Sequence, residues 1–333
     1  MTAVPFRRSP LQYGRLGATD LTVSTLAFGT APLGGLYGSV EDAAAIAVVH
    51  ESLDLGINFI DTSSSYGSAE ERLGKALAGR RQNVVLATKA GRVGSDAFDF
   101  SPAALRRSLE KSLGLLRTDY VDIFQLHNIE FGSLPALFED SFAELISLRE
   151  QGKCRYIGMT GYPAAAIIRA IRETDLDVAL TYAHATLLDD TLQRDIAPVA
   201  RTRGVGLLNA AAVALGLLTA HGPTRPNGHP ASPPIRDAAE RMAALCAARG
   251  ADIAFVAHQY SIQRSGCAAT VIGTSKSSHL RSAVAAAETP VDEELLRDLL
   301  ALRPPIDARE WSSGLPENNG PTTDRGPRGE ESP

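Results

Sequence analysis

Short apolar runs alternate with longer amphipathic stretches along almost the whole of this 333-residue chain. The runs lack in-and-out alternation, which is typical of parallel strands buried beneath helices. Eight such units fit a closed (β/α)8 TIM barrel better than an open doubly wound sheet, and no GxGxxG turn follows the first run. The expected strands are 25–29, 57–61, 83–89, 121–127, 154–159, 178–183, 205–210 and 269–273.

The start of the chain differs from the body that follows it. Residues 13–16 and 21–24 flank Gly17-Ala18-Thr19-Asp20, a pattern that predicts an N-terminal β-hairpin. Because no Pro/Gly-rich linker divides the body, we expect a single barrel domain over 13–315, preceded by a flexible leader, 1–12.

Two stretches are expected to lack regular structure. Residues 221–235 are rich in proline and follow the seventh expected strand, which predicts a long surface loop near the barrel mouth. Residues 316–333 contain almost no apolar side chains and cannot bury enough surface to order themselves. They are therefore expected to form a disordered C-terminal tail.

Composition and charge exclude several classes of protein. A net charge of -5 gives no electrostatic reason to expect nucleic acid or an anionic membrane as a partner. No apolar run approaches the roughly 20 residues of a membrane helix, and the N-terminus does not resemble a secretory signal. Cys154, Cys246 and Cys267 are isolated, and no cluster has metal-ligand spacing, so we expect a cytoplasmic protein with reduced cysteines and no metal.

Costly polar residues stand at the ends of three consecutive expected strands. Asp61 ends the second, Lys89 the third and His127 the fourth, and Tyr66 lies in the loop after Asp61. In barrels of this type the C-terminal strand ends carry catalytic groups, so these side chains should converge. A lysine cation stabilises a tyrosinate, whose parent hydroxyl has an unperturbed pKa near 10, and a carboxylate keeps the lysine charged. Such a set can move a proton at an alcohol or carbonyl oxygen.

Each member also has a structural alternative. Asp61 could cap a helix, and Lys89 could extend its ammonium group to solvent. His127 could be a hydrogen-bonded core histidine, and Tyr66 a packing aromatic. These alternatives explain the residues singly but not their occurrence together at successive strand ends, which favours a shared site.

The segment Gly56-Ile57-Asn58-Phe59-Ile60-Asp61-Thr62, with Tyr66-Gly67, Glu71, Leu73-Gly74, Thr88-Lys89 and Leu126-His127, resembles the aldo-keto reductase family over roughly residues 12–312. That resemblance implies a (β/α)8 barrel and a nicotinamide cofactor. It also implies that Tyr66 is the general acid/base, tuned by Asp61 and Lys89. His127 would orient the substrate.

Further segments are similar to a subgroup of the family that oxidises C1 of cyclic aldoses, such as L-fucose or L-galactose, or pyridoxal in its hemiacetal form. They are 28–34, 127–134, 216–219, 229–233 and 310–314. The resemblance implies a small sugar or pyridoxal-like substrate and a lactone product. Of the residues that could line the substrate pocket, His184 could equally be structural and Trp311 could equally dock the C-terminus. The expected substrate residues are Asn128, Phe131, His184 and Trp311, with Glu130 nearby.

The resemblance also implies where the cofactor lies. Thr160-Gly161 stands where many family members have Ser-Asn, and no stacking aromatic stands in the seventh strand, where Asn209 could substitute. The loop after the last strand and the helix start that follows suit phosphate groups. The expected cofactor residues are Thr30, Asp61, Thr160, Gly161, Asn209, Ala210, Gly216, Gly273, Thr274, Ser275, Lys276 and His279.

Cofactor choice and reaction direction stay open at this point. Thr274 and Leu280 stand where NADP-preferring members carry Lys and Arg, which favours NAD. Lys276 leaves NADP open, as would a one-residue shift that brings in His279 or Arg281. The alternatives to aldose oxidation are an NADPH-dependent carbonyl reductase that tailors a secondary metabolite, and a nicotinamide-sensing binding module without enzymatic activity. The oligomeric state is not predicted.

Overall fold

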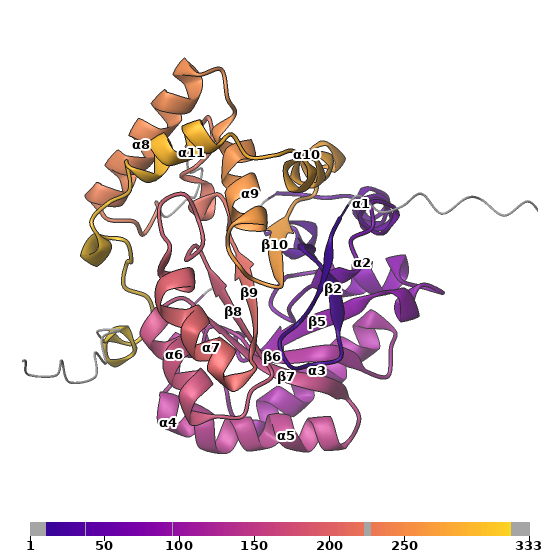
Figure 1. The fold of residues 1–333 in the computed structure, drawn as a ribbon. Coiled ribbons are helices and arrows are strands. Elements are labelled where there is room, and N and C mark those ends of the chain that lie inside the picture. Colours follow the sequence, from indigo (N-terminus) through magenta and orange to yellow (C-terminus); the bar gives the residue numbers. More distant parts are fainter. Residues whose placement is uncertain (1–10, 37, 95, 223–227, 321–333) are drawn as a thin grey trace, which may run out of the picture.

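Eight parallel strands close into a barrel in the computed structural model, which describes residues 11–36, 38–94, 96–222 and 228–320 (Figure 1). Each strand pairs with the next along the chain, and the last pairs with the first. The barrel predicted from the apolar runs is confirmed, with strand bounds that shift by one or two residues. The strands are β3 (Leu26–Gly29), β4 (Phe59–Asp61), β5 (Val85–Ala90), β6 (Val121–Leu126), β7 (Cys154–Gly161), β8 (Val178–Tyr182), β9 (Gly206–Ala210) and β10 (Ala269–Gly273).

Helices surround the barrel because their apolar faces pack on the outer faces of the strands. In α6, for example, Ile167 and Ile171 are fully buried, whereas Arg172 and Glu173 on the other side are exposed. The helices are α1 (Asp42–Asp54), α2 (Ala69–Ala76), α3 (Pro102–Leu116), α4 (Leu134–Ala136), α5 (Phe142–Glu150), α6 (Ala164–Glu173), α7 (Ala197–Arg203), α8 (Pro233–Ala248), α9 (Ile253–Gln263), α10 (Ser277–Glu288) and α11 (Glu293–Leu300).

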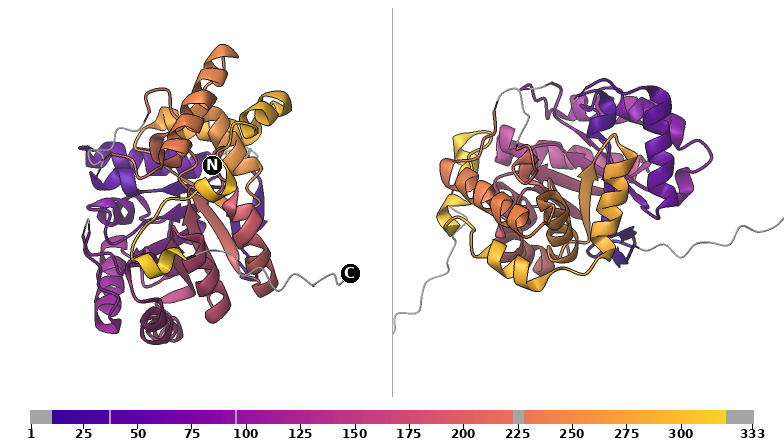
Figure 2. Two further views of the ribbon diagram at one scale, coloured as in Figure 1. Left: turned by 90° about the vertical axis from the view of Figure 1, so that its left-hand side faces the viewer. Right: turned by 90° about the horizontal axis from the view of Figure 1, so that it is seen from above.

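The helices α8 and α11 lie outside the ring of barrel helices (Figure 2), and a second apolar cluster packs them on α9. Met242 of α8 and Leu299 of α11 are both fully buried in it. Part of the expected loop 221–235 belongs to this unit, because Pro233 already starts α8 and Ile235 is buried. Proline suits the first turn of a helix, whose N–H groups have no intrahelical acceptor. The interpretation of those residues as loop is therefore wrong, while 223–227 lie outside the described residues.

Side chains fill the barrel, and the hairpin covers one end. Inward-facing residues such as Phe59, Ile123 and Leu208 form one apolar cluster with Leu16 and Val23. The last two come from the predicted hairpin, β1 (Tyr13–Arg15) and β2 (Thr22–Ser24), which pairs antiparallel. The hairpin therefore closes the N-terminal end of the barrel, and the polar strand ends lie at the opposite, C-terminal end.

Both chain ends stay packed further than expected. Leu11, assigned to the flexible leader, is buried in the main core. Beyond the expected boundary at 316, Pro316–Asn319 form a 3-10 helix, and Asn318 is only 3% exposed. The tail prediction is wrong for these four residues because Asn318 finds backbone acceptors on the barrel. Residues 1–10 of the leader and 321–333 of the tail lie outside the described residues.

The described ranges also bear on the classes of protein and site that the sequence excludes. No helix in them has both the length and the apolar character needed to cross a membrane. The same ranges hold no group of three or more His, Cys, Asp or Glu side chains placed to hold a metal ion.

Candidate active site

An ion pair between the ends of β4 and β5 forms the buried base of the site. The Nζ of Lys89 donates to Oδ2 of Asp61 at 2.5 Å and to the backbone oxygen of Thr62 at 2.8 Å, and both charged side chains are 5% exposed or less. Burial raises the pKa of the Asp61 carboxyl against the opposing effect of the lysine cation. Burial also opposes the charge on Lys89, but Asp61 and the Tyr66 hydroxyl outweigh it and raise the pKa of the lysine.

Tyr66 stands above this pair in the loop between β4 and α2. Lys89 Nζ lies 5.2 Å from the centre of the tyrosine ring. The loop passes close to the turn after β3, where a Cβ atom on Gly34 would lie 1.9 Å from the backbone oxygen of Tyr66. Gly67 adopts a positive φ of 53° at the same crossing. Glycine at both positions lets the two loops touch, which fixes Tyr66 over the lysine.

His127 completes the group from the end of β6. Its ring meets the Tyr66 ring edge-on, with 5.6 Å between centres and an interplanar angle of 81°. The Nδ1 atom lies 3.0 Å from the Ser63 hydroxyl. Burial, followed by the charges of Lys89 and Arg92, holds the pKa of His127 well below its ordinary value, so the imidazole is neutral near pH 7. When the Ser63 hydroxyl donates to Nδ1, the proton of the neutral ring is on Nε2.

The three residues predicted from the strand ends and Tyr66 from the loop after β4 therefore lie together. Three neighbours were not predicted. Ser63 was hidden in a run of serines, and Arg92 lies in the loop after β5. Glu70 of α2 is 2% exposed and accepts from Thr88 Oγ1 at 2.6 Å, next to Lys89 in the sequence. A signal for Glu70 exists in the sequence, since it precedes the Glu71 and Leu73 positions of the family motif.

The residues expected around a nicotinamide ring fall into two groups. Thr30 is buried and donates to Thr62 Oγ1 at 2.7 Å, and Thr160 Oγ1 accepts from the Asn128 backbone at 3.1 Å, so both lie beside the four-residue group. Gly161 lies next to them, where an added Cβ would come within 3.0 Å of Glu130 Oε2. Asn209 does not fit its expected role. Its position in register with Thr181 and Thr270 turns it to the outer face of the barrel, where it donates to the Ala185 oxygen.

The loops after β9 and β10 have features that fit a dinucleotide. After Ala210, three residues that are not glycine adopt positive φ, namely Ala211, Ala214 and Leu215, and Gly216 follows them at 104°. Such strain clusters at ligand sites. The expected phosphate loop Gly273-Thr274-Ser275-Lys276 leads into α10, which has no side-chain cap, so its first N–H groups suit an anion.

The neighbouring side chains at the start of α10 bear on NADP. Lys276 and His279 are exposed there. Arg281 donates from Nε to Glu51 Oε1 at 2.5 Å, and its side chain is largely exposed.

The expected substrate residues are spread more widely. Asn128 is buried directly after His127, and Phe131 is 39% exposed and stacks on Phe98 with 4.3 Å between ring centres. His184 is fully buried, with Nδ1 on Asp189 and Nε2 on the Tyr162 backbone oxygen, so its ring has no nitrogen left for a substrate. Trp311 stacks on Tyr162 at 4.2 Å, which supports its docking role over sugar stacking.

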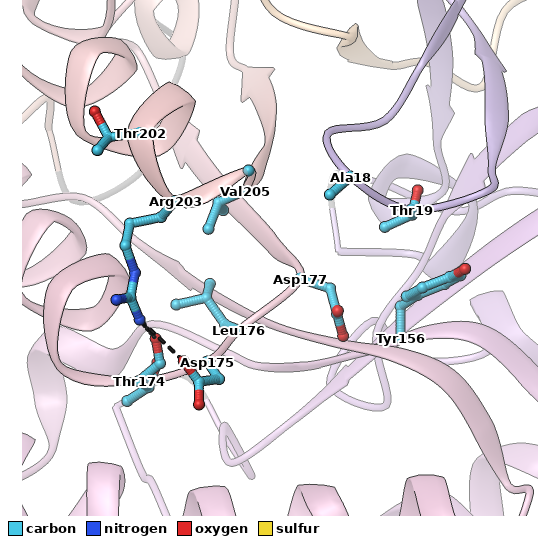
Figure 3. A pocket seen from close by; sticks show the side chains of 11 residues that line it. Ala18, Thr19, Tyr156, Thr174, Asp175, Leu176, Asp177, Thr202, Arg203 and Val205 are labelled. Carbon is cyan, nitrogen blue, oxygen red and sulfur yellow. Dashed lines mark hydrogen bonds and ion pairs between the residues drawn. The ribbon is translucent and has the colours of Figure 1, made fainter.

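A cavity of about 390 Å³ lies elsewhere, at the N-terminal end of the barrel (Figure 3). It is lined by the hairpin turn at Ala18 and Thr19 and by the segments before β8 and β9. Because Tyr66 and its partners occupy the opposite end, this cavity does not belong to the four-residue group.

Comparison with known proteins agrees with this geometry. Residues 25–303 match the family described as "Aldo/keto reductase family". L-galactose dehydrogenase of Arabidopsis thaliana is 38% identical over 91% of this chain and 98% of its own length. D-threo-aldose 1-dehydrogenase of a Pseudomonas species is 28% identical over 79% of this chain and 89% of its own length. The solved structure of an aldo-keto reductase from Bacillus halodurans in its holo form shares the fold, with a TM-score of 0.74 at 24% identity and coverage of 93% and 100%. The chain belongs to the aldo/keto reductase family of NAD(P)-dependent oxidoreductases.

Proposed function

We propose that the protein oxidises a cyclic hemiacetal to a lactone, at C1 of an aldose or at the former aldehyde carbon of pyridoxal, with Tyr66 as the general base. The observation that carries the proposal is the placement of Tyr66 over the buried Lys89–Asp61 pair, edge-on to a neutral His127. The choice of an aldose rests on similarity to two relatives whose names are aldose dehydrogenases.

The four residues divide the work by their charge and position. The tyrosinate, stabilised by the Lys89 cation, takes the proton of the anomeric hydroxyl as the C1–O bond becomes a carbonyl. Asp61 keeps the buried lysine charged. His127, protonated on Nε2, donates a hydrogen bond to the reacting oxygen. A bound nicotinamide supplies the acceptor for the hydride that leaves C1.

Residues at the mouth support a substrate with one apolar face. Phe98 and Phe131 stack on each other beside the loop that follows His127, and Phe131 is 39% exposed. An aromatic surface of this kind suits the C–H face of a pyranose or the ring of pyridoxal.

For the cofactor we propose NAD over NADP, with the strained loop 210–216 and the start of α10 as its binding segments. Thr274 and Leu280 stand where NADP-preferring members carry Lys and Arg, and Arg281 pairs with Glu51, which leaves the exposed Lys276 as a cation for a 2′-phosphate. A Lys276→Ala variant should therefore weaken residual NADP use more than NAD use.

The proposal is tested by a panel of L-galactose, L-fucose, D-arabinose and pyridoxal, each with NAD and NADP, followed at 340 nm. We expect turnover of at least one hemiacetal with NAD. Tyr66→Phe should lower kcat by about 10³-fold, within the range of general acid–base catalysis, while cofactor binding by fluorescence stays intact. Turnover that Tyr66→Phe leaves unchanged would contradict the assignment of the base.

Two other outcomes would point to the alternatives. Faster NADPH-driven reduction of ketones than oxidation of any hemiacetal would identify a carbonyl reductase. Binding of NAD or NADP without turnover of any hemiacetal or carbonyl would identify a nicotinamide-sensing module.

A further inference from the structure

Three irregular segments that carry the subgroup resemblance, 127–134, 229–233 and 310–314, meet at one side of the barrel mouth. Trp311 links two of them, because it stacks on Tyr162 after β7 and meets His229 edge-on at 5.5 Å. The C-terminal segment then continues across the turn that follows His127. Its contacts there converge on a single residue, Glu130.

Glu130 is a fully buried carboxylate that accepts hydrogen bonds from four parts of the chain. Its Oε1 accepts from Asn128 Nδ2 at 3.1 Å, from the Tyr162 backbone at 3.3 Å, from the Tyr182 hydroxyl at 3.5 Å and from Ser313 Oγ at 3.2 Å. These donors come from the turn after β6, the ends of β7 and β8, and the C-terminal segment. The carboxylate therefore joins three strand ends to the last described segment of the chain.

The backbone of Glu130 strengthens the same junction. Its carbonyl oxygen accepts from the Leu315 N–H at 2.8 Å and from Asn318 Nδ2 at 2.9 Å. A Cβ atom on Gly314 would lie 2.1 Å from that oxygen, so only glycine lets the C-terminal segment approach so closely. The segment 313–318 is thus held on Glu130 through both side-chain and main-chain contacts.

A simple packing role does not explain a carboxylate at this position. No lysine or arginine in the described ranges forms a salt bridge with Glu130, and its Oε2 has no hydrogen-bond partner there. Burial raises the pKa of the carboxyl accordingly. Burying a carboxyl group without a cationic partner costs free energy, so the hydrogen bonds from its four donors must offset that cost.

The hydrogen bonds to Glu130 hold the turn directly after His127. Asn128 adopts a positive φ of 61°, a conformation that asparagine tolerates only at some cost. Two hydrogen bonds hold it, from its N–H to Thr160 Oγ1 and from its side chain to Glu130. If Asn128 relaxed, the imidazole of His127 would lose its position over Ser63 and Tyr66.

We propose that Glu130 is a positioning residue that fixes the His127 imidazole by clamping the Asn128 turn between the strand ends and the C-terminal segment. This inference rests on the role of His127 in the proposed function. It predicts that loss of Glu130 impairs the same step as loss of His127, and not an independent one.

The test is a double-mutant cycle of Glu130→Ala and His127→Gln in the full-length enzyme, with the substrate that the panel identifies. We expect Glu130→Ala to lower kcat by about 10- to 100-fold, as for a misplaced catalytic group, with the Kd for NAD within about twofold of wild type. In the His127→Gln background, the same change should lower kcat by less than about twofold, because the residues act as one unit. Equal losses in both backgrounds would overturn the proposal.

Two further variants separate positioning from folding. Glu130→Gln keeps an acceptor oxygen, so its kcat should fall clearly less than that of Glu130→Ala. Equal losses would show that the hydrogen bonds accepted by Oε1 do not position His127. Asp177→Ala removes a carboxylate that accepts from the Ile157 N–H at the N-terminal end of the barrel. It should lower Tm without changing kcat. A fall in Tm with unchanged kcat for Glu130→Ala as well would also overturn the proposal.

A readout that needs no turnover distinguishes this proposal from the proposed function. Carbon–proton NMR of the seven histidines, with His127 assigned from the spectrum of His127→Gln, gives the pKa of that ring. Since burial is the main cause of its low pKa, Glu130→Ala should raise it toward the ordinary value of 6.5. An unchanged pKa of His127 would contradict the clamp even if no substrate of the enzyme were known.

Discussion

The two ends of the barrel treat buried charge differently. At the N-terminal end, Asp122 accepts from Arg81 at 2.8 Å, from Arg155 at 3.0 Å and from the Leu86 N–H at 2.9 Å. At the C-terminal end, Asp61 has a single cation, and Glu130 forms no salt bridge in the described part of the chain. Both carboxylate oxygens of Asp122 thus have partners, whereas Asp61 and Glu130 at the candidate site each keep one buried oxygen without a hydrogen-bond partner among the described residues.

Backbone strain is distributed in the same way. Of the described non-glycine residues with positive φ, Arg117 ends α3 near the N-terminal end, where a left-handed helix cap is ordinary. The others follow β6, β8 and β9 at the C-terminal end: Asn128, Ala183, Ala211, Ala214 and Leu215. Residues held in such conformations tend to mark functional sites. The N-terminal end of the barrel therefore stabilises the fold, whereas the C-terminal end gives up stability for a site.

The largest expected effect is on catalysis at the C-terminal end. Lys89→Met removes the cation that supports Tyr66 and leaves the Asp61 carboxylate buried without its partner. We expect kcat/KM to fall by about 10³- to 10⁴-fold, and the free energy of unfolding to fall as well. Steady-state kinetics and urea denaturation measure the two effects.

The matched control is the double variant Asp61→Asn/Lys89→Met. It removes both buried charges, so much of the lost stability should return while activity stays lost. Recovery of activity together with stability would mean that this pair only supports the fold.

The reverse result is expected at the N-terminal end. Asp122→Ala leaves Arg81 and Arg155 without their buried partner, which should lower the free energy of unfolding by about 4 kcal/mol. Because Asp122 lies at the start of β6 and not at its catalytic end, kcat of the folded enzyme at 25 °C should not change. A kcat reduced tenfold or more would show that the two ends are coupled.

The sequence predicts those features that depend on residues close together along the chain. The strands are predictable because their apolar runs are local, and Asp61, Lys89 and His127 are predictable because each ends such a run. Asn209 was placed wrongly because a shift of one residue along a strand moves a side chain to the other face.

Other parts of the site depend on contacts distant in sequence. The donors of Glu130 include Tyr182 and Ser313, and no local pattern brings them together. Similarity to relatives could mark 127–134 and 310–314 separately, but only the fold shows that they touch. The role of His184 was undecidable for the same reason, because its partners are a backbone oxygen and a loop aspartate.

The smallest expected effect concerns this histidine, which is structural although it lies at the catalytic end. Both of its ring nitrogens donate, to Asp189 and to the Tyr162 carbonyl, and Glu310 lies 3.3 Å from Nε2. Asp189, Glu310 and the carbonyl together overcome burial and raise the pKa of His184 to about 9. A folded-state pKa above the unfolded value of about 6.5 stabilises the protein fully below pH 6.5, and this stabilisation is lost as the pH rises through 9. We expect the free energy of unfolding to fall by about 3 kcal/mol over that interval, at about 1.4 kcal/mol per pKa unit. Urea denaturation between pH 6 and 10 should show the fall in wild type and not in His184→Gln. Because His184 contacts neither Tyr66 nor His127, the pH dependence of kcat should be the same in both proteins; a shifted kcat profile in His184→Gln would place this histidine in the catalytic machinery after all.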